Sequence, residues 1–249
     1  MSGIVEQIHP EVEIIFSTVA DGSMASGGGQ KSLPEHGQNA DKFLSTHGFP
    51  LERSRVFVSY SDTNSYTEVV RVNDKSTRQD IDCDALYTTT ADLVITLPVA
   101  DCIATVVYDP IAKLLGGLHL GRHSSIAGLI ESFAIEVADN AGSDPRDWLV
   151  WMSPSIRETH DIMDYFTPPN INNWREHMRH NDEGKIHIDN VGHNIARLVR
   201  AGVDPSNITV SPINTYTDKR FYSQRAYVEQ GDPARLGRMT VAARILPSL

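Results

Sequence analysis

The amino-acid sequence predicts an α/β (α+β) fold, a single-domain layered sandwich with a mixed β-sheet over residues 1–249. Chains of 249 residues that combine helices and strands often form one domain. Many short runs of β-branched and aromatic residues are separated by turn residues, whereas three segments have helical periodicity. No internal repeat is visible. We therefore expect one mixed sheet with helices packed against it.

The N-terminal half is expected to be mainly strands. A Gly/Ser-rich segment, residues 20–40, has no hydrophobic period and predicts a loop, either a flexible flap over a site or a surface excursion. A helix over 39–47 follows and ends at Gly48. The predicted strands cover residues 12–18, 55–60, 68–72, 85–88, 93–97, 103–108 and 114–120.

The C-terminal half is expected to contain the longer helices. An apolar stripe predicts a helix over 124–140. A second helix, 189–201, has Asp189 as its N-cap and ends at Gly202. The polar, His-rich segment 153–187 predicts an irregular insert with short helices. Its histidines are expected to form a solvated face, although the His177–His180 pair could instead chelate a metal ion. The remaining predicted strands are 147–152, 208–210 and 240–245, and the three tryptophans are expected in the core.

Composition excludes several classes of protein. The formal net charge of −10 argues against a general nucleic-acid or membrane binder, although a local arginine pocket could still hold a small anion. The two cysteines, Cys83 and Cys102, are expected as reduced thiols, although one bridge is conceivable. The N-terminus lacks a signal-peptide pattern, and the longest apolar stretch, 93–107, is too short to span a bilayer. We expect a soluble, cytoplasmic monomer or homodimer.

The chemistry-bearing residues cluster between two predicted strands. Cys102 lies between one apolar strand and the next, and His119 lies near the end of the strand after that. If these strands are neighbours, a thiol and an imidazole meet, either as zinc ligands or as a nucleophile with its base. Alternatively, Cys102 is a small core residue. Asp101 is difficult to bury without a partner, so it marks a site or caps a turn.

These motifs resemble a known family. DALYT…LPVADC…VVYDP…LGGLHLG, with Cys102 and His119 seventeen residues apart, is similar to the pattern of the laccase-domain (polyphenol oxidase) family. IIFST near the start and RFYSQRAYVEQGDPARLGRMTVAARI near the end also resemble it. The resemblance implies a compact α/β sandwich, purine nucleoside phosphorylase activity with adenosine deaminase activity in some members, and one zinc on two His and one Cys. Cys102 and His119 match two of those ligands.

The third ligand departs from the family pattern. The family's first His falls within SYSDTNSYTEVVRV, where Ser65 or Tyr66 stands instead. Zinc could recruit another ligand, bind weakly or be absent. The candidate substitutes are His123, His36, Asp62 and Glu68.

The resemblance also suggests the roles of other residues. Phosphate and substrate would contact Arg122, Arg225, Arg238 and Phe221, and Asp101 would transfer a proton. Two family arginines are replaced, by Val19 and Ala226. The sequence therefore predicts a divergent zinc-dependent enzyme that cleaves or deaminates purine nucleosides with phosphate as partner. The alternatives are a non-catalytic homologue that binds a nucleoside or a protein, and a metal-free Cys/His enzyme. A copper laccase would need more His and Cys ligands.

Overall fold

The structure is a computed structural model that describes residues 3–25, 33–51, 54–58, 66–73 and 79–247. Two six-stranded sheets form its centre, and each contains parallel and antiparallel pairs. The first sheet has the order β1 (Ile4–His9), β2 (Val12–Phe16), β15 (Met239–Ile245), β7 (Val94–Val99), β3 (Ser54–Val58) and β5 (Gln79–Asp82). The second has the order β14 (Ile208–Val210), β10 (Leu149–Met152), β8 (Ile103–Asp109), β9 (Leu114–Leu120), β6 (Ala85–Thr88) and β4 (Val69–Arg71). The predicted α/β class with mixed pairing is confirmed, with two sheets in place of one.

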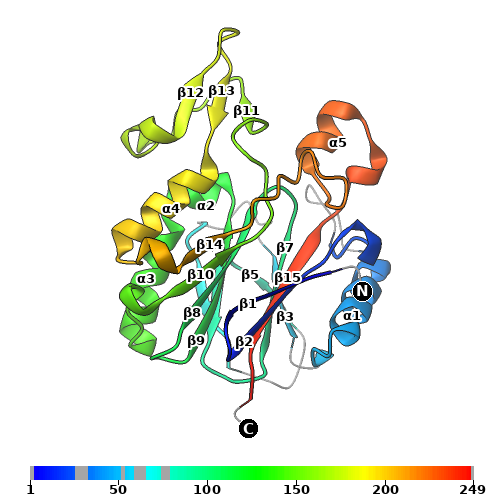
Figure 1. The fold of residues 1–249 in the computed structure, drawn as a ribbon, viewed down its shortest axis with the longest axis vertical. Helices are drawn as coiled ribbons and strands as arrows, with labels where there is room; N and C mark the ends of the chain where they lie inside the picture. Colours follow the sequence, from blue (N-terminus) through cyan, green and yellow to red (C-terminus); the bar gives the residue numbers. More distant parts are fainter. Residues whose placement is uncertain (1–2, 26–32, 52–53, 59–65, 74–78, 248–249) are drawn as a thin grey trace.

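The two sheets pack face to face, and helices cover their outer faces (Figure 1). The central core joins residues of β2, β7 and β15 to residues of β6, β8 and β9. Gly117 of β9 lets Leu97 of the opposite sheet approach, since an added Cβ would lie 2.8 Å from its Cδ1. The strands are apolar on both faces because both are covered, which explains why their sequences read as continuous hydrophobic runs.

The helices differ from the predicted ones at their ends. α1 (Pro34–Thr46) packs on the first sheet and begins at Pro34, which suits the first helical turn, so the predicted loop 20–40 is shorter than expected. Residues 26–32 of that loop lie outside the described residues. The predicted helix 124–140 is two helices, α2 (Arg122–Ala127) and α3 (Leu129–Ala141), because Gly128 adopts a left-handed φ of 89°. α4 (Asn190–Ala201) matches its prediction, and the Asp189 side chain accepts a hydrogen bond from the Gly192 amide at 2.8 Å.

The insert is more ordered than predicted. It contains a three-stranded sheet of β11 (Ile162–Met163), β13 (Ile186–Ile188) and β12 (Met178–His180), over a small cluster that includes the buried Trp174. A further helix, α5 (Gln224–Gln230), was not predicted. Figure 1 shows the insert and α5 projecting from the same end of the sandwich. Within the described ranges, no helix is both long and apolar enough to cross a membrane.

Candidate functional site

The sheet register brings Cys102 and His119 together. β8 and β9 pair antiparallel with Ala104 opposite His119, and Cys102 directly precedes β8. A Cβ added to Gly121 would lie 3.1 Å from the Cys102 Sγ and 3.4 Å from the His119 Nε2. Both reactive atoms therefore border the space over Gly121. The expectation that neighbouring strands unite the thiol and the imidazole is confirmed.

A buried carboxylate fixes the imidazole ring. The Nδ1 of His119 lies 3.0 Å from the Oδ1 of Asp84, and the His119 amide donates to the Asp84 carbonyl at 2.8 Å. Asp84 is fully buried, and its Oδ2 has no hydrogen-bond partner among the described residues. Burial alone disfavours the charged imidazole, but the Cys102 thiolate and Asp84 together raise the pKa of His119 to about 9. The sequence analysis did not select Asp84, although it begins the DALYT motif.

Buried polar contacts hold the turn that carries this ring. The Ser124 hydroxyl donates to the His119 carbonyl at 2.6 Å, and the Ser125 hydroxyl donates to the Gly121 carbonyl at 2.7 Å. Asn194 of α4 in turn donates to the Ser125 hydroxyl at 2.8 Å. Because these groups satisfy one another inside the protein, the end of β9 and the start of α2 form a fixed platform.

Asp101, which directly precedes Cys102, forms hydrogen bonds with residues on the other wall of the pocket. Its φ of 69° is left-handed, a conformation that Asp tolerates better than most residues. The Oδ1 accepts from the Thr215 hydroxyl at 2.7 Å, and the Oδ2 accepts from the Arg225 amide at 2.8 Å. One oxygen therefore holds the start of α5 and the other holds the segment before it, which gives Asp101 a positioning role in this arrangement. The proton-transfer role expected for it stays a prediction.

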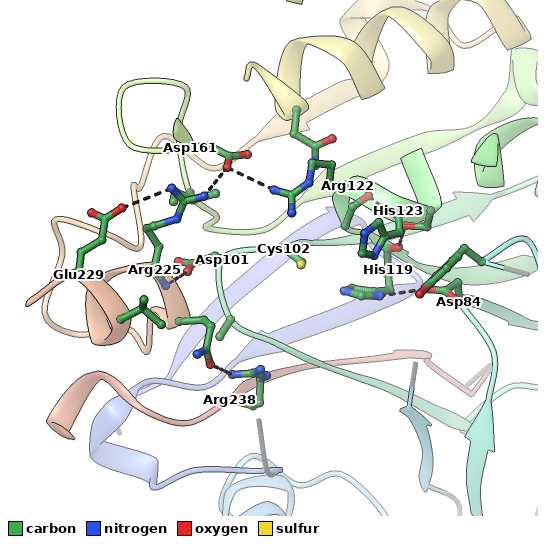
Figure 2. A pocket seen from close by; sticks show the side chains of 18 residues that line it. Asp84, Asp101, Cys102, His119, Arg122, His123, Asp161, Arg225, Glu229 and Arg238 are labelled. Carbon is green, nitrogen blue, oxygen red and sulfur yellow. Dashed lines mark hydrogen bonds and ion pairs between the residues drawn. The ribbon is translucent and has the colours of Figure 1, made fainter. Parts of the chain in front are cut away.

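An arginine pair shares one buried carboxylate across the pocket, as Figure 2 shows. Asp161 Oδ1 lies 3.2 Å from the Arg225 Nη2 and 3.7 Å from the Arg122 Nη1. Arg225 also contacts Glu229 at 3.3 Å and donates to the Ile162 carbonyl. Burial raises the pKa of Asp161 even though both arginines favour its charged form. Neither Asp161 nor Glu229 was selected from sequence.

The other predicted site residues are divided between the pocket and the core. Arg238 lines the pocket and donates to the Gly237 carbonyl at 2.8 Å. His123 also lines it, with its ring centroid 5.1 Å from that of Tyr66. Phe221 is fully buried and stacks on Phe16 at 5.7 Å, so the structure places it in the core, outside the pocket lining.

The residues that line the pocket surround a cavity of about 620 Å³. That volume lies within the range of small-molecule sites and accommodates a nucleoside. Figure 2 shows Cys102 near the centre of the pocket, with His119 and Asp84 to one side of it, Arg225 to the other, and Arg122 and Arg238 above and below it. The described ionisable lining contains three arginines and four carboxylates. The pocket therefore offers hydrogen-bond donors to a ligand without being strongly cationic.

Cys102 and His119 meet the requirements of a catalytic zinc site only in part. Sulfur and imidazole nitrogen are preferred zinc ligands, and a carboxylate behind the imidazole is typical of zinc sites. However, catalytic zinc usually has three protein ligands, and the described residues contain no group of three that could hold a metal ion. Asp62 and Ser65 lie outside the described residues. The described donors do not fit a catalytic zinc.

Comparison with known families gives a consistent assignment. The sequence profile of a family described as "Multi-copper polyphenol oxidoreductase laccase" matches residues 35–245. The chain belongs to this family. Cys102 and His119 lie within the matched region. Two solved structures share the laccase-family fold seen here: Bacillus licheniformis YfiH, with a TM-score of 0.78, 20% identity and coverage of 98% of this chain and 96% of that one, and Geobacillus stearothermophilus YlmD, with a TM-score of 0.75, 21% identity and coverage of 97% and 94%.

Several relatives of this laccase-family chain are named purine nucleoside phosphorylase. The protein from Staphylococcus saprophyticus is 28% identical over 220 residues, which cover 83% of this chain and 79% of that protein. The protein from Deinococcus radiodurans is 29% identical over 161 residues, 63% of this chain and 58% of its own length. The protein from Bacteroides thetaiotaomicron is 23% identical over 155 residues, 59% of this chain and 57% of its own length. The match therefore spans little more than half of the latter two relatives.

Proposed function

We propose that this laccase-family chain cleaves purine nucleosides with inorganic phosphate as the second substrate. The observation that carries the proposal is a nucleoside-sized cavity whose lining joins Cys102 and His119 with three arginines. The names of several relatives support the same substrate class.

Phosphorolysis breaks the bond between ribose C1′ and purine N9 and forms a bond from C1′ to a phosphate oxygen. The protein has to hold phosphate beside C1′ and stabilise the departing base. Arg122 is the best placed to hold phosphate, because its 3.7 Å contact to Asp161 is longer than the 3.2 Å contact of Arg225. Arg225 and Arg238 complete the cationic side.

Zinc, the cofactor that the resemblance implies, has no step in this proposal. Cys102 and His119 would be its two available ligands among the described residues, and His123 lines the same pocket. Elemental analysis of the purified chain, beside Cys102→Ala, tests whether one zinc is retained.

The proposed function is tested by separating the products of inosine with and without phosphate. We expect hypoxanthine and ribose 1-phosphate, formed only when phosphate is present. Arg122→Ala should raise the KM for phosphate by about 10-fold or more, with a smaller effect on the KM for inosine. Arg146→Ala is the matched control, because Arg146 is exposed and pairs with Asp144 away from the pocket. Absence of hypoxanthine at saturating inosine and phosphate would refute the proposal.

A further inference from the structure

Two aromatic rings lie in contact in the lining of the pocket. Tyr66 and His123 both line it, and their ring centroids are 5.1 Å apart with an angle of 41° between the ring planes. We infer that these two rings form an aromatic wall on which the purine base stacks, and that this wall selects purine over pyrimidine nucleosides. The inference rests on the proposed function, since it names the residues that recognise the base of the nucleoside.

The first support is the scarcity of other flat surfaces in the pocket. Among the lining residues that the structure describes, the aromatic rings are those of Tyr66, His119 and His123. The ring of His119 is held through its Nδ1, 3.0 Å from Asp84. Phe221, the aromatic residue expected at the substrate, is buried in the core. Tyr66 and His123 together therefore provide the largest aromatic surface of the described lining.

The second support is the fixed position and the charge of the imidazole. His123 is the second residue of α2, directly before Ser124 and Ser125, whose hydroxyls hold the start of this helix. Burial, followed by the neighbouring charge of Arg122, lowers the pKa of His123. The ring is therefore neutral at pH 7. A neutral aromatic ring suits contact with an uncharged base.

The third support is the backbone at Tyr66. Its φ of 60° is left-handed, a conformation that bulky residues rarely adopt. Residues in such conformations persist where the surrounding structure holds them, and they cluster at ligand-binding sites. Here the next strand holds the chain, because β4 pairs with β6 and the Ala85 amide donates to the Glu68 carbonyl at 3.0 Å. Since Ala85 directly follows Asp84, the chain around Tyr66 lies at the Asp84 side of the pocket.

A purine gains more from this aromatic wall than a pyrimidine does. Aromatic rings attract one another both when they stack with an offset and when the edge of one meets the face of the other. Because the planes of Tyr66 and His123 are tilted by 41°, the two rings of a purine can stack on one and meet the edge of the other. A pyrimidine has a single ring and covers less of the wall. The other described hydrocarbon side chains of the lining are Ala100, Ile156 and Val228, which have no flat face.

The test is the binding of inosine and uridine to the full chain in the absence of phosphate, measured by titration calorimetry. We expect the wild-type chain to bind inosine about 10-fold or more tightly than uridine. Tyr66→Ala should weaken inosine binding by about 10- to 100-fold and change uridine binding by less than about 3-fold. Tyr66→Phe keeps the ring, so its inosine affinity should stay within about 3-fold of wild type.

Further variants separate stacking from other roles of these residues. His123→Phe keeps a flat ring without nitrogens and should retain inosine binding within about 3-fold, whereas His123→Ala should lose about 10-fold. Tyr165→Ala is the matched control and should leave inosine affinity unchanged, because Tyr165 is exposed and lies outside this lining. In Tyr66→Ala the KM for phosphate should stay within about 2-fold of wild type, since a merely structural defect would impair both substrates.

The outcomes separate this inference from the proposed function. An unchanged preference for inosine in Tyr66→Ala, with phosphate-dependent release of hypoxanthine, would overturn the inference and leave the proposed function standing. Equal losses in His123→Phe and His123→Ala, or a loss in Tyr165→Ala in place of Tyr66→Ala, would also overturn the inference. Inosine binding that depends on Tyr66, in a chain that releases no hypoxanthine, would support the aromatic wall and refute phosphorolysis. A chain that binds neither nucleoside would overturn both.

Discussion

A phosphate held by Arg122 and Arg225 would have to bind beside the carboxylate of Asp161, and Asp161→Asn tests how strongly that carboxylate opposes it. The carboxylate is buried and shared by Arg122 and Arg225, at 3.7 and 3.2 Å. Phosphate held by the same two guanidinium groups would lie roughly 5 Å from the carboxylate, where one pair of like charges costs about 3 kcal/mol at an effective dielectric constant near 20. That energy corresponds to roughly a 100-fold change in affinity. Because Asn keeps the shape and an acceptor oxygen, we expect phosphate binding to tighten by about 10- to 100-fold.

Titration calorimetry with inorganic phosphate measures this effect directly. The control is Asp164→Asn, because Asp164 is an exposed carboxylate nearby that pairs with Lys185 on the insert. The control should leave phosphate affinity within about 2-fold of wild type, since exposed charges are screened by solvent. Unchanged or weaker phosphate binding by Asp161→Asn would show that phosphate does not use the Arg122–Arg225 pair.

Three further predictions concern packing, access and pH. Gly116→Ala would place a Cβ 2.3 Å from the Phe133 Cζ, so it should cost about 1–3 kcal/mol of unfolding free energy and lower the Tm. Adding Phe133→Leu to this variant should recover part of the lost stability. If stability is not recovered, the strain does not come from the contact with Phe133. Gly121→Ala should keep the Tm within about 3 °C, because its φ of −81° suits Ala, yet reduce phosphate-dependent purine release by about 10-fold or more. Normal purine release would contradict the proposed nucleoside site over Gly121. Burial, with the nearby His177, lowers the pKa of His193 to about 4. As pH falls below about 6.5, the imidazole therefore becomes protonated in the unfolded chain before it does in the folded one. Roughly 2 kcal/mol of folding stability should be lost between pH 6.5 and pH 4. Urea unfolding of His193→Gln should show a smaller loss over that range, and an equal loss would refute the assignment.

Local patterns were sufficient for most of the central strands. β6, β8, β9 and β14 agree closely with the predicted ranges because each is a short β-branched or apolar run bounded by turn residues. The neighbouring placement of Cys102 and His119 followed from the turn at Asp109-Pro110, which joins β8 directly to β9. The thiol–imidazole pair could therefore be predicted from the sequence.

The division into two sheets could not be read from sequence. Pairs such as β15 with β2 and β7 join residues far apart in the chain, and no local property specifies them. The break between α2 and α3 depends on the left-handed conformation of Gly128, and glycine inside a helical pattern often remains helical. The strands of the insert have two or three residues each, too few for a periodic signal.

Two site carboxylates were missed for a related reason. Asp84 and Asp161 acquire their roles only when folding brings them against His119 and the arginine pair. Their flanking residues do not distinguish them from the other acidic residues of this chain. The position of Asp84 at the start of the DALYT motif was the signal that could have selected it.

If the proposed function is right, a purine nucleoside binds over Gly121, beside Cys102 and His119 and within the cavity that three arginines also line. A crystal structure of the wild-type chain soaked with inosine tests it most directly. The claim predicts density for the nucleoside over Gly121, with the purine toward Cys102 and the ribose toward Arg122. Nucleoside density in a second groove, which Tyr165, Lys185 and Glu229 line between the insert and α5, with the space over Gly121 vacant, would contradict it.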